Sequence, residues 1–338
     1  MAGVSYSDTS EDRSMSQHAE TSGLCAFDVV QRIRKNKQEE TIEEMKKNDV
    51  DGSLVALYKI HSLIPDLFKM EREEVVHLCA NSVIYNKDDL LVLNKPYGIS
   101  VTEGPAQFIS LQGILPALRR LLVPKSKCLV PVHRLDRCTT GVLMIAASQL
   151  RLSELRDMFA RREITKKYLC LTKMVPEPST GVVNVPIGEK RIGGNFKMVP
   201  LLIGDGKNKG KYRRCTDPRI VETKYEVVKQ GNKCALVECT AQSGAKHQIR
   251  SHLGLSLGTP IVGDHKYSNY LGKQPQRLPG EVLDKLGIRS SKARHLPMYL
   301  HASEVEIPDF VRGHNFHVTA ELPKFFTYTM KKLHLRPL

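Results

Sequence analysis

The sequence has no tryptophan, few aromatic residues and no long apolar run. Phe and Tyr make up 6% of the 338 residues, so an extended platform for stacking single-stranded bases is not expected. The longest apolar stretches, such as Val142–Ala147, are far shorter than the roughly 20 residues that a transmembrane helix needs, and we expect no membrane span. An apolar fraction of 41% beside 26% charged residues predicts a soluble chain that buries a substantial core.

Several catalytic and metal-binding patterns are missing as well. The eight cysteines include no C-x-x-C pair, and none has a histidine partner at the spacing of a zinc site. We therefore expect reduced thiols and no metal centre. Neither a Ser-His-Asp nucleophile elbow nor a phosphate-binding P-loop is present, which argues against a serine hydrolase and a P-loop NTPase.

Positive charge is in excess, and it is concentrated in two segments. The chain has 51 Lys and Arg against 36 Asp and Glu, a net charge of +15. Residues 117–167 carry twelve basic and four acidic residues, a net charge of +8. Residues 190–214 carry eight basic residues and one acidic residue, a net charge of +7. A surface that only keeps a protein soluble mixes both signs. The segregation predicts a surface for a polyanion, with nucleic acid the first candidate and a chance excess the alternative.

The chain divides into three parts by composition. Residues 1–24 hold six serines, four acidic residues and one arginine with no apolar pattern, and we expect a disordered tail. Residues 25–80 are predicted to be a helical N-terminal extension, with a charged helix over 28–48 and a short amphipathic segment that ends near Pro65. Residues 81–338 contain the stronger strand and helix patterns and are predicted to be the main folded domain, which the family resemblance described below implies to be the catalytic domain.

Strands and helices follow one another irregularly in this last part. Strands are predicted over 82–85, 90–93, 142–147, 168–172, 222–228, 235–239 and 299–307, and helices over 109–122 with an interruption at Pro116, over 149–161 and over 246–253. Without a regular strand–helix–strand alternation, the pattern predicts an α+β fold with a mixed, mainly antiparallel sheet flanked by helices. Residues 188–218 are rich in Gly and Lys and show neither the helical nor the strand periodicity of apolar residues, so we expect a long basic loop there.

One segment combines the residues best suited to chemistry. His133-Arg-Leu-Asp-Arg-Cys-Thr-Thr-Gly141 leads into a predicted buried strand. It places Asp136 between Arg134 and Arg137, so the carboxyl should ionise readily in a positive field. Taken alone, this arrangement is more typical of a salt-bridged loop. No second acidic residue lies near enough in sequence to form the carboxylate pair of a glycosidase.

The complete segment resembles the H-R-L-D-x-x-T-S-G motif of the RluA family of RNA pseudouridine synthases, with Thr140 in place of Ser. Four further blocks resemble the family in the same order: Asn94-Lys-Pro-Tyr-Gly98, Lys166-Lys-Tyr168, Gly244-Ala-Lys-His-Gln-Ile-Arg-Ser-His-Leu253 and Pro260-Ile-Val-Gly-Asp-His-Lys-Tyr267. The resemblance covers roughly residues 82–338. It implies the pseudouridine synthase fold and an isomerase acting on uridines in RNA. Such an isomerisation consumes nothing, so no cofactor is expected.

The resemblance also implies roles for individual residues. Asp136 matches the family's catalytic aspartate, and Arg250 matches the arginine that pairs with it. Tyr168 matches the tyrosine that stacks on the target uracil and helps to remove the C5 proton. Arg134 matches the arginine that fills the space left by the flipped nucleotide. Whether the aspartate forms a covalent adduct stays open.

These assignments have simpler alternatives, which are a surface Arg134, a core Tyr168 and an Arg250 on a helix surface. We expect His247 and His252 to have packing or hydrogen-bonding roles. The basic loop is expected to contact RNA phosphates through Lys207, Lys209, Lys211, Arg213 and Arg214.

Two departures from the family pattern stand out. The family usually has Arg at the position of Ala245, so either a phosphate contact or a contact that supports the catalytic residues is missing unless Lys246 replaces it. Many relatives also carry an N-terminal S4 RNA-binding module, whereas residues 1–80 are too short and lack its pattern. Target choice then depends on the basic loops of the catalytic domain or on partner proteins.

The sequence is most similar to mitochondrial members of the family, which implies the mitochondrial matrix. The nucleus or cytoplasm is the alternative, because residues 1–24 are too acidic for an ordinary presequence. We expect a monomer whose partners are its RNA substrate and ribosome-assembly or RNA-granule proteins. The competing functions are a non-catalytic RNA-binding or mitochondrial ribosome-assembly factor with the same fold, and a structural protein whose basic face binds an acidic partner.

Overall fold

The computed structural model describes residues 26–103, 109–201, 216–270, 274–311 and 313–335. The helices are α1 (Ala26–Lys47), α2 (Gly52–His61), α3 (Arg72–Ala80), α4 (Leu111–Leu122), α5 (Gln149–Ala160), α7 (Gln248–Ser251), α8 (Gly280–Leu286) and α9 (Lys324–Lys332), with a π-helical turn at His252–Ser256 and a 3-10 helix at Ser290–His295. The strands are β1 (Val83–Lys87), β2 (Leu90–Lys95), β3 (Val130–Pro131), β4 (Thr140–Ala146), β5 (Thr165–Lys173), β6 (Thr180–Val183), β7 (Ile187–Ile192), β8 (Asn195–Pro200), β9 (Thr216–Arg219), β10 (Thr223–Gly231), β11 (Cys234–Ala241), β12 (Leu300–Val311) and β13 (His314–Thr319).

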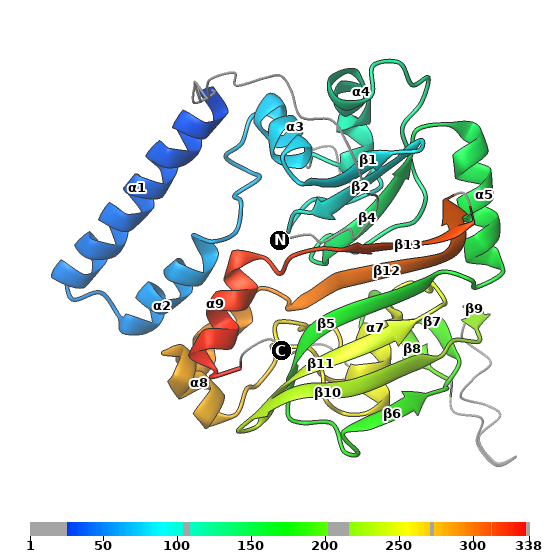
Figure 1. Ribbon diagram of the computed structural model, residues 1–338. Helices are drawn as coiled ribbons and strands as arrows, with labels where there is room; N and C mark the ends of the chain where they lie inside the picture. Colours follow the sequence, from blue (N-terminus) through cyan, green and yellow to red (C-terminus); the bar gives the residue numbers. More distant parts are fainter. Residues whose placement is uncertain (1–25, 104–108, 202–215, 271–273, 312, 336–338) are drawn as a thin grey trace, which may run out of the picture.

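Ten of these strands form one twisted sheet (Figure 1). Its order is β1-β2-β4-β12-β5-β11-β10-β6, with β13 paired to β12 and β3 paired to β4. In the described part of the chain, β12 and β4 are the parallel pair and the other pairs are antiparallel. The prediction of an α+β fold with a mixed, mainly antiparallel sheet is therefore confirmed.

The parallel contact between β4 and β12 depends on a glycine. Gly141 has φ +106°, and a Cβ atom at this position would lie 2.0 Å from the carbonyl oxygen of Ala302. Only glycine permits both this backbone conformation and this approach. The last residue of the Asp136 motif thus lets β4 begin directly beside β12, in the middle of the sheet.

Strands β2 and β4 in the first half of the sheet are buried on both faces. In β4, Leu143 and Ile145 pack with α3 and α4 on one face, while Val142 and Met144 pack with α5 and β13 on the other. This explains why the strand reads as a continuous apolar run rather than an alternating one. In the second half, α2, α8 and α9 cover one face, and the turn containing α7 covers the other.

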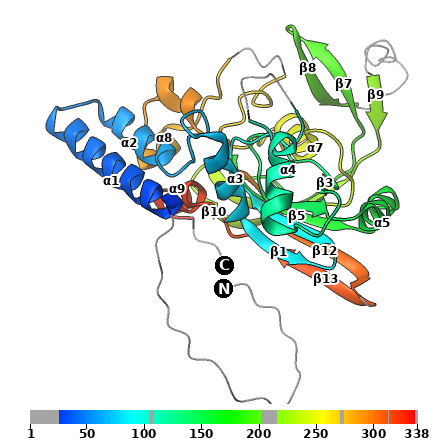
Figure 2. The same cartoon turned by 90° about the horizontal axis from the view of Figure 1, so that it is seen from above.

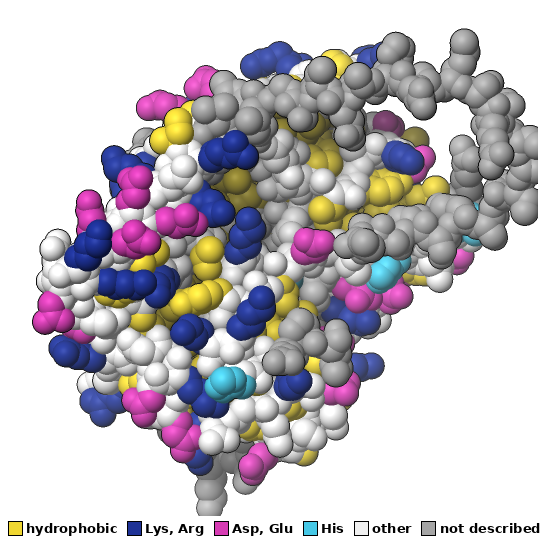
Figure 3. All heavy atoms as spheres, turned by 60° about the vertical axis from the view of Figure 1, so that its left-hand side comes forward, with side chains coloured by type: hydrophobic (Ala, Val, Ile, Leu, Met, Phe, Trp, Pro, Cys, Tyr) yellow, Lys and Arg dark blue, Asp and Glu magenta, His cyan; other side chains and the backbone are white. Residues whose placement is uncertain are grey.

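The two predicted N-terminal helices are present. α2 packs Leu57 and Ile60 against the core beside α9. α1 contacts α2 and forms an ion pair between Arg34 and Glu74 at 3.0 Å. Helix α1 carries six basic and five acidic residues. Both signs are interspersed on the face of the molecule that includes these helices (Figure 3), so this extension does not form a basic surface.

Three predicted elements differ from the structure. The helix at 111–122 continues through Pro116, because its buried face, including Leu115 and Leu118, packs on the core while Pro116 is exposed and gives up one main-chain bond at the surface. The predicted helix over 246–253 has only one α-helical turn, because His247 has φ +55° and the chain passes into a π-helical turn at residue 252.

The prediction of a continuous basic loop over 188–218 was wrong. Residues 187–200 form the hairpin β7–β8, to which β9 adds a third strand. Gly193 and Gly194 form the two-residue turn, with φ values of +59° and +88°, as tight hairpins require. The strands lacked a clear signal because few apolar residues, chiefly Ile187, Met198 and Val221, build the core of this small sheet. It lies at the opposite end of the molecule from α1 (Figure 2).

Candidate active site

Asp136 lies in the loop that joins β3 to β4. Its neighbour Leu135 is buried in the core beside α4, and the Asp136 side chain itself is 19% exposed. The Asp136 carbonyl accepts a hydrogen bond from the Thr139 N–H (3.0 Å), and the Arg137 carbonyl accepts one from the Gly98 N–H (2.9 Å). The loop is therefore fixed by a buried side chain and by its main chain.

A buried lysine connects this loop to the preceding turn. The Nζ atom of Lys95 donates to the carbonyl oxygens of Ile99, Pro96 and Arg137 at 2.8, 3.0 and 3.2 Å. Lys95 is 1% exposed, and burial lowers its pKa to about 8. The segment around Lys95 that resembles the family is thus a support beneath the Asp136 loop.

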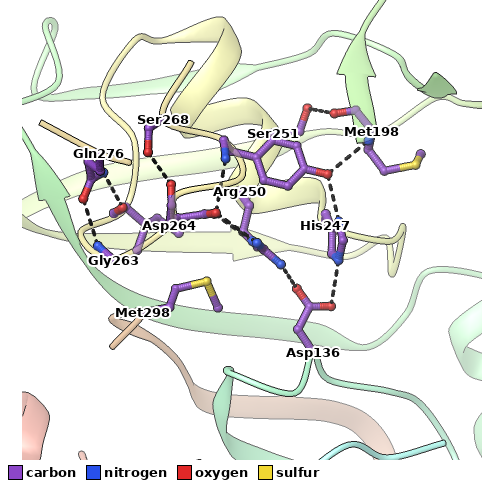
Figure 4. A network of polar contacts seen from close by, with 12 residues as sticks. Asp136, Met198, His247, Arg250, Ser251, Gly263, Asp264, Ser268, Gln276 and Met298 are labelled. Atoms are coloured by element: carbon purple, nitrogen blue, oxygen red, sulfur yellow. Dashed lines mark hydrogen bonds and ion pairs between the residues drawn. The ribbon is translucent and has the colours of Figure 1, made fainter. Parts of the chain in front are cut away.

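Arg250 joins Asp136 to a second carboxylate, Asp264 (Figure 4). Its Nη1 donates to Asp136 Oδ2 at 2.7 Å, while Nε and Nη2 donate to the two oxygens of Asp264 at 2.7 and 2.9 Å. Burial opposes the charge on the guanidinium, but the two carboxylates raise the pKa of Arg250. The bidentate pair with Asp264 fixes the plane of the guanidinium and so directs Nη1 at Asp136.

The surroundings of Asp136 favour its ionised form. Burial of the carboxyl favours the neutral form, but His247, Arg250 and Arg134 hold its pKa below the ordinary value of 3.8. His247 Nε2 lies 3.5 Å from Oδ1, the oxygen that Arg250 does not contact. Asp136 is therefore a carboxylate at neutral pH, with a defined neighbour at each oxygen.

Tyr168 and Arg134 line the same hollow as Asp136. Tyr168 comes from the middle of β5, where it is paired with Ala302 of β12 and Cys239 of β11. Burial, and then the charge of Asp136, raise the pKa of Tyr168, so the phenol stays protonated at neutral pH. Arg134 is exposed.

A larger hollow of about 770 Å³ continues from the first. The main sheet and α5 form one side of it, and β7, β8 and β9 contribute to the other. Its cations are Arg134, Arg162, Lys166, Arg219 and Lys246, and its acidic residues are Glu189 and Asp217. This excess of five cations over two carboxylates suits a polyanion.

Four of these cations have defined partners, and one of them, Arg162, donates from Nη2 to the Ile220 carbonyl at 3.2 Å. Lys246 Nζ forms an ion pair with Glu189 at 2.8 Å, and Arg219 Nε forms one with Asp217 at 2.9 Å. Lys166 donates to the Ser243 carbonyl at 2.9 Å, and burial lowers its pKa to about 8. Lys246, the candidate replacement for the arginine missing at Ala245, is thus held by Glu189 rather than directed at Asp136.

The basic segment 117–167 is not one continuous patch. Its charges are distributed over α4, the Asp136 loop, α5 and β5, and several have acidic partners. Arg151 pairs with Glu154 at 2.6 Å, Arg161 with Glu163 at 2.6 Å and Lys167 with Glu304 at 3.0 Å. The part of this segment that faces the two hollows includes Arg134, Arg162 and Lys166.

The structure brings Tyr168 and Arg250 together with Asp136 and Arg134 around one hollow, although three separate segments of the sequence supply these residues. Arg250 does not lie on a helix surface, because it is buried against two carboxylates, whereas Tyr168 packs against the core and also borders the hollow. The predicted phosphate-binding residues Lys207, Lys209, Lys211, Arg213 and Arg214 lie outside the described residues.

Three residues of the network, His247, Asp264 and Tyr267, were not predicted from the sequence to take part in it. His252 has the structural role expected for it, bonding Thr223 and the Val185 carbonyl. His247, for which a similar role was expected, contacts Asp136 instead. Asp264 and Tyr267 complete the network (Figure 4). All three missed residues belong to segments that resemble the family, which was the available signal.

Within the described ranges, no group of three or more His, Cys, Asp or Glu side chains is arranged to hold a metal ion. No helix in that part of the chain is long and apolar enough to cross a membrane.

Comparisons with known proteins agree with this geometry. A family model described as RNA pseudouridylate synthase matches residues 89–254. The chain is 34% identical over 321 residues to the mouse protein named "Pseudouridylate synthase RPUSD4, mitochondrial", covering 92% of this chain and 84% of that protein. It is 30% identical over 246 residues to "Ribosomal large subunit pseudouridine synthase C" of Rickettsia typhi, covering 72% and 69%.

A solved structure has the same fold. It is that of "Human RNA Pseudouridylate Synthase Domain Containing 4", with a TM-score of 0.65 and 33% identity, covering 78% of this chain and 96% of that one. The expected activity of an RNA-modifying isomerase is confirmed by these relatives, and the mitochondrial names support the expected mitochondrial localisation. The chain belongs to the RNA pseudouridylate synthase family.

Proposed function

We propose that Asp136 is the catalytic carboxylate of this RNA pseudouridine synthase and that the hollow beside it receives the target uridine. The observation that carries the proposal is a partly exposed carboxylate that Arg250 fixes at one oxygen and that borders the hollow lined by Tyr168. A fixed, ionised carboxylate can attack or electrostatically stabilise the sugar carbon when the glycosidic bond breaks.

The reaction is an isomerisation and consumes no second reactant. The bond between N1 and C1′ breaks, the uracil turns, and a bond forms between C5 and C1′. The C5 proton then leaves, and N1 gains a proton. The charge that develops at C1′ lies next to the Asp136 carboxylate, while Arg250 keeps that carboxylate ionised and in place.

Tyr168 and Arg134 have roles in holding the nucleotide. A uridine must leave its stack to reach a carboxylate at the bottom of a hollow. The ring of Tyr168 is placed to stack on the uracil, and the exposed Arg134 is placed to occupy the vacated position in the RNA. Because the Tyr168 hydroxyl is protonated, a part in removing the C5 proton requires it to pass on its own proton in the same step.

The adjoining larger hollow is suited to the nucleotides that flank the target. Its excess of cations would contact phosphates, and the basic residues 207–214 follow β8 in the chain. A relative from Bos taurus is named "Mitochondrial mRNA pseudouridine synthase RPUSD3", which supports mitochondrial RNA as the substrate of this chain. The monomeric state, the protein partners and the division of the chain at residues 24 and 80 stay predictions.

Replacement of Asp136 by Asn tests the proposal. The amide keeps the shape of the side chain but cannot supply a negative charge, so isomerisation should be lost while RNA affinity stays nearly unchanged. The measurement is single-turnover formation of pseudouridine, with binding of the same RNA measured in parallel. Turnover near the wild-type rate would reject Asp136 as the catalytic group.

A further inference from the structure

We propose that His247 is a positioning residue for Asp136, and that a chain of hydrogen bonds from the main chain of β8 through Tyr267 fixes which imidazole nitrogen carries the proton. This inference rests on the proposed function of Asp136. It assigns a part in the reaction to three groups that lie outside the Asp136–Arg250 pair, namely the main-chain N–H of Met198, the Tyr267 hydroxyl and the His247 ring (Figure 4).

The directions of the hydrogen bonds follow from the first donor. The Met198 N–H can only donate, and it donates to the Tyr267 hydroxyl oxygen at 3.0 Å. Among the contacts of the described residues, the acceptor for the proton of that hydroxyl is His247 Nδ1, 2.8 Å away. With Nδ1 as an acceptor, the proton of the neutral ring is on Nε2. That atom is the one facing Asp136 Oδ1, at 3.5 Å.

His247 is neutral in this environment. Its side chain is 12% exposed, and burial lowers its pKa to about 4. Of the charged groups that face it, Asp136 and Asp264 favour protonation, whereas Arg250 and Lys266 oppose it; the Tyr267 hydroxyl also faces it. A neutral ring has one N–H, so the tautomer decides whether Nε2 presents an N–H or a lone pair to Asp136 Oδ1, which lies 3.5 Å away, somewhat beyond hydrogen-bond distance.

The backbone around His247 is shaped for this contact. His247 has φ +55°, a left-handed conformation that is unfavourable for a non-glycine residue. The surrounding packing maintains it. The ring contacts Tyr267 edge to face, with centroids 5.5 Å apart, and Tyr267 is fully buried. A Cβ atom at Gly254 would lie 2.5 Å from the Tyr267 carbonyl oxygen, so the π-helical turn packs directly on this tyrosine.

The chain of bonds connects Asp136 to the small sheet. Met198 belongs to β8, and its side chain is part of the core of the three-stranded sheet. Its carbonyl accepts a hydrogen bond from Ser251 Oγ at 2.8 Å. Both main-chain polar groups of this one β8 residue are therefore bonded to the segment that carries His247, Arg250 and Tyr267, and the position of β8 sets the orientation of the imidazole.

Tyr267→Phe removes the hydroxyl and keeps the ring. Without its donor at Nδ1, His247 should populate both tautomers, and only a fraction of the molecules should keep the N–H on the side of Asp136. We expect the single-turnover rate to fall about tenfold, as for the loss of one hydrogen bond of about 1.4 kcal/mol, with RNA affinity unchanged. Because Asp136 loses a donor, the acidic limb of its pH–rate profile should move to higher pH.

Tyr299→Phe is the matched control. Tyr299 is also fully buried, and its hydroxyl bonds Thr329 in the core beneath α9, away from Asp136. It should lose comparable stability and leave the rate and the pH–rate profile unchanged. Equal effects of the two substitutions on rate and profile would overturn the proposal.

The tautomer can also be measured without activity. Nitrogen-15 chemical shifts of the His247 ring should show the proton on Nε2 in the wild-type chain and a mixture in Tyr267→Phe. A proton on Nδ1 in the wild type would reject the inference. If the tautomer is as expected but Asp136→Asn remains active, the proposed role of Asp136 fails while the hydrogen-bond chain stands.

A second pair of variants covers the case in which Tyr267→Phe does not fold. His247→Gln keeps an amide N–H near the position of Nε2, whereas His247→Leu keeps only bulk. We expect His247→Gln to retain most of the single-turnover rate. His247→Leu should lose about tenfold in this rate, and the acidic limb of its pH–rate profile should be displaced. Equal rates for the two variants would show that donation to Asp136 is not needed.

Discussion

The Asp136 pocket and the three-stranded sheet use charge in opposite ways. In the pocket, charged groups are buried and compensated: Asp264 is 1% exposed, Arg250 is 12% exposed, and each contacts an opposite charge. In the small sheet, the charged residues of β9 lie at the surface, because all residues of this strand are exposed, and so is Ile220 next to it. The difference fits the tasks that we propose for the two regions, because chemistry needs a fixed geometry whereas phosphate binding needs accessible cations.

The two regions also differ in what stabilises them. The Asp136 loop lies against the core of the main sheet, with Leu135 buried beside α4. The core cluster of the small sheet contains three buried apolar residues, and the sheet is connected to the pocket through the main chain of Met198. Substitutions in the pocket should therefore act on the rate of the bound complex, and substitutions around the small sheet should act on binding. The predictions below are ordered by their effect on that rate.

Arg250→Gln should have the largest of these effects. It removes the cation between two carboxylates and leaves Asp264 buried without its charged partner, which costs about 3–5 kcal/mol in other buried pairs. We expect loss of at least a thousandfold in single-turnover rate together with a lower free energy of unfolding. The measurements are the turnover of RNA-saturated enzyme and urea unfolding.

A companion variant separates the two consequences for Arg250. Arg250→Lys keeps a charge but loses the bidentate geometry, so it should recover part of the stability and little of the rate. If Lys restored the full rate, only the charge of Arg250 would matter, and the fixed plane of the guanidinium would have no role in the reaction.

Tyr168→Phe should have a smaller effect, between about tenfold and a hundredfold on the rate. The ring that would stack on uracil is kept, so RNA binding should persist. Tyr168→Leu removes the ring as well and should weaken binding of the target uridine. A wild-type single-turnover rate for Phe would limit Tyr168 to stacking and exclude its hydroxyl from proton transfer.

The comparison of the two regions also shows what could be predicted from the sequence. Strands β2 and β4 were predicted because both of their faces are buried, which leaves a continuous apolar run. The hairpin β7–β8 was missed because its core is small and its exposed residues follow no period. A short sheet that is stabilised by contacts with distant segments has little signal of its own.

The candidate site shows the same limit. The pairing of Arg250 with Asp136 came from the family resemblance, and the two residues are 114 positions apart. The role of His247 depends on Tyr267 and on a main-chain N–H of β8. Since any residue except proline has that N–H, no residue type in the sequence could indicate it.

The smallest effect on the rate is expected from the basic residues between β8 and β9. Replacing Lys207, Lys209, Lys211, Arg213 and Arg214 together by Gln should leave the rate of RNA-saturated enzyme unchanged. If these side chains contact phosphates, the substitution should weaken RNA binding for every sequence alike, because phosphate contacts do not read bases. Each lost contact should reduce the slope of log affinity against log salt concentration by roughly 0.7 to 0.9.

The helix α1 supplies a control with the same change in net charge. Arg32, Lys35, Lys37, Lys46 and Lys47 are exposed at the opposite end of the molecule, on a helix that mixes both signs. Replacing these five by Gln should leave the salt slope at its wild-type value, since a general loss of positive charge is screened beyond about 10 Å at 0.1 M salt. If both variants lowered the slope equally, RNA would respond to net charge alone. If neither did, the phosphate contacts would have to come from Arg134, Arg162 and the other cations of the larger hollow.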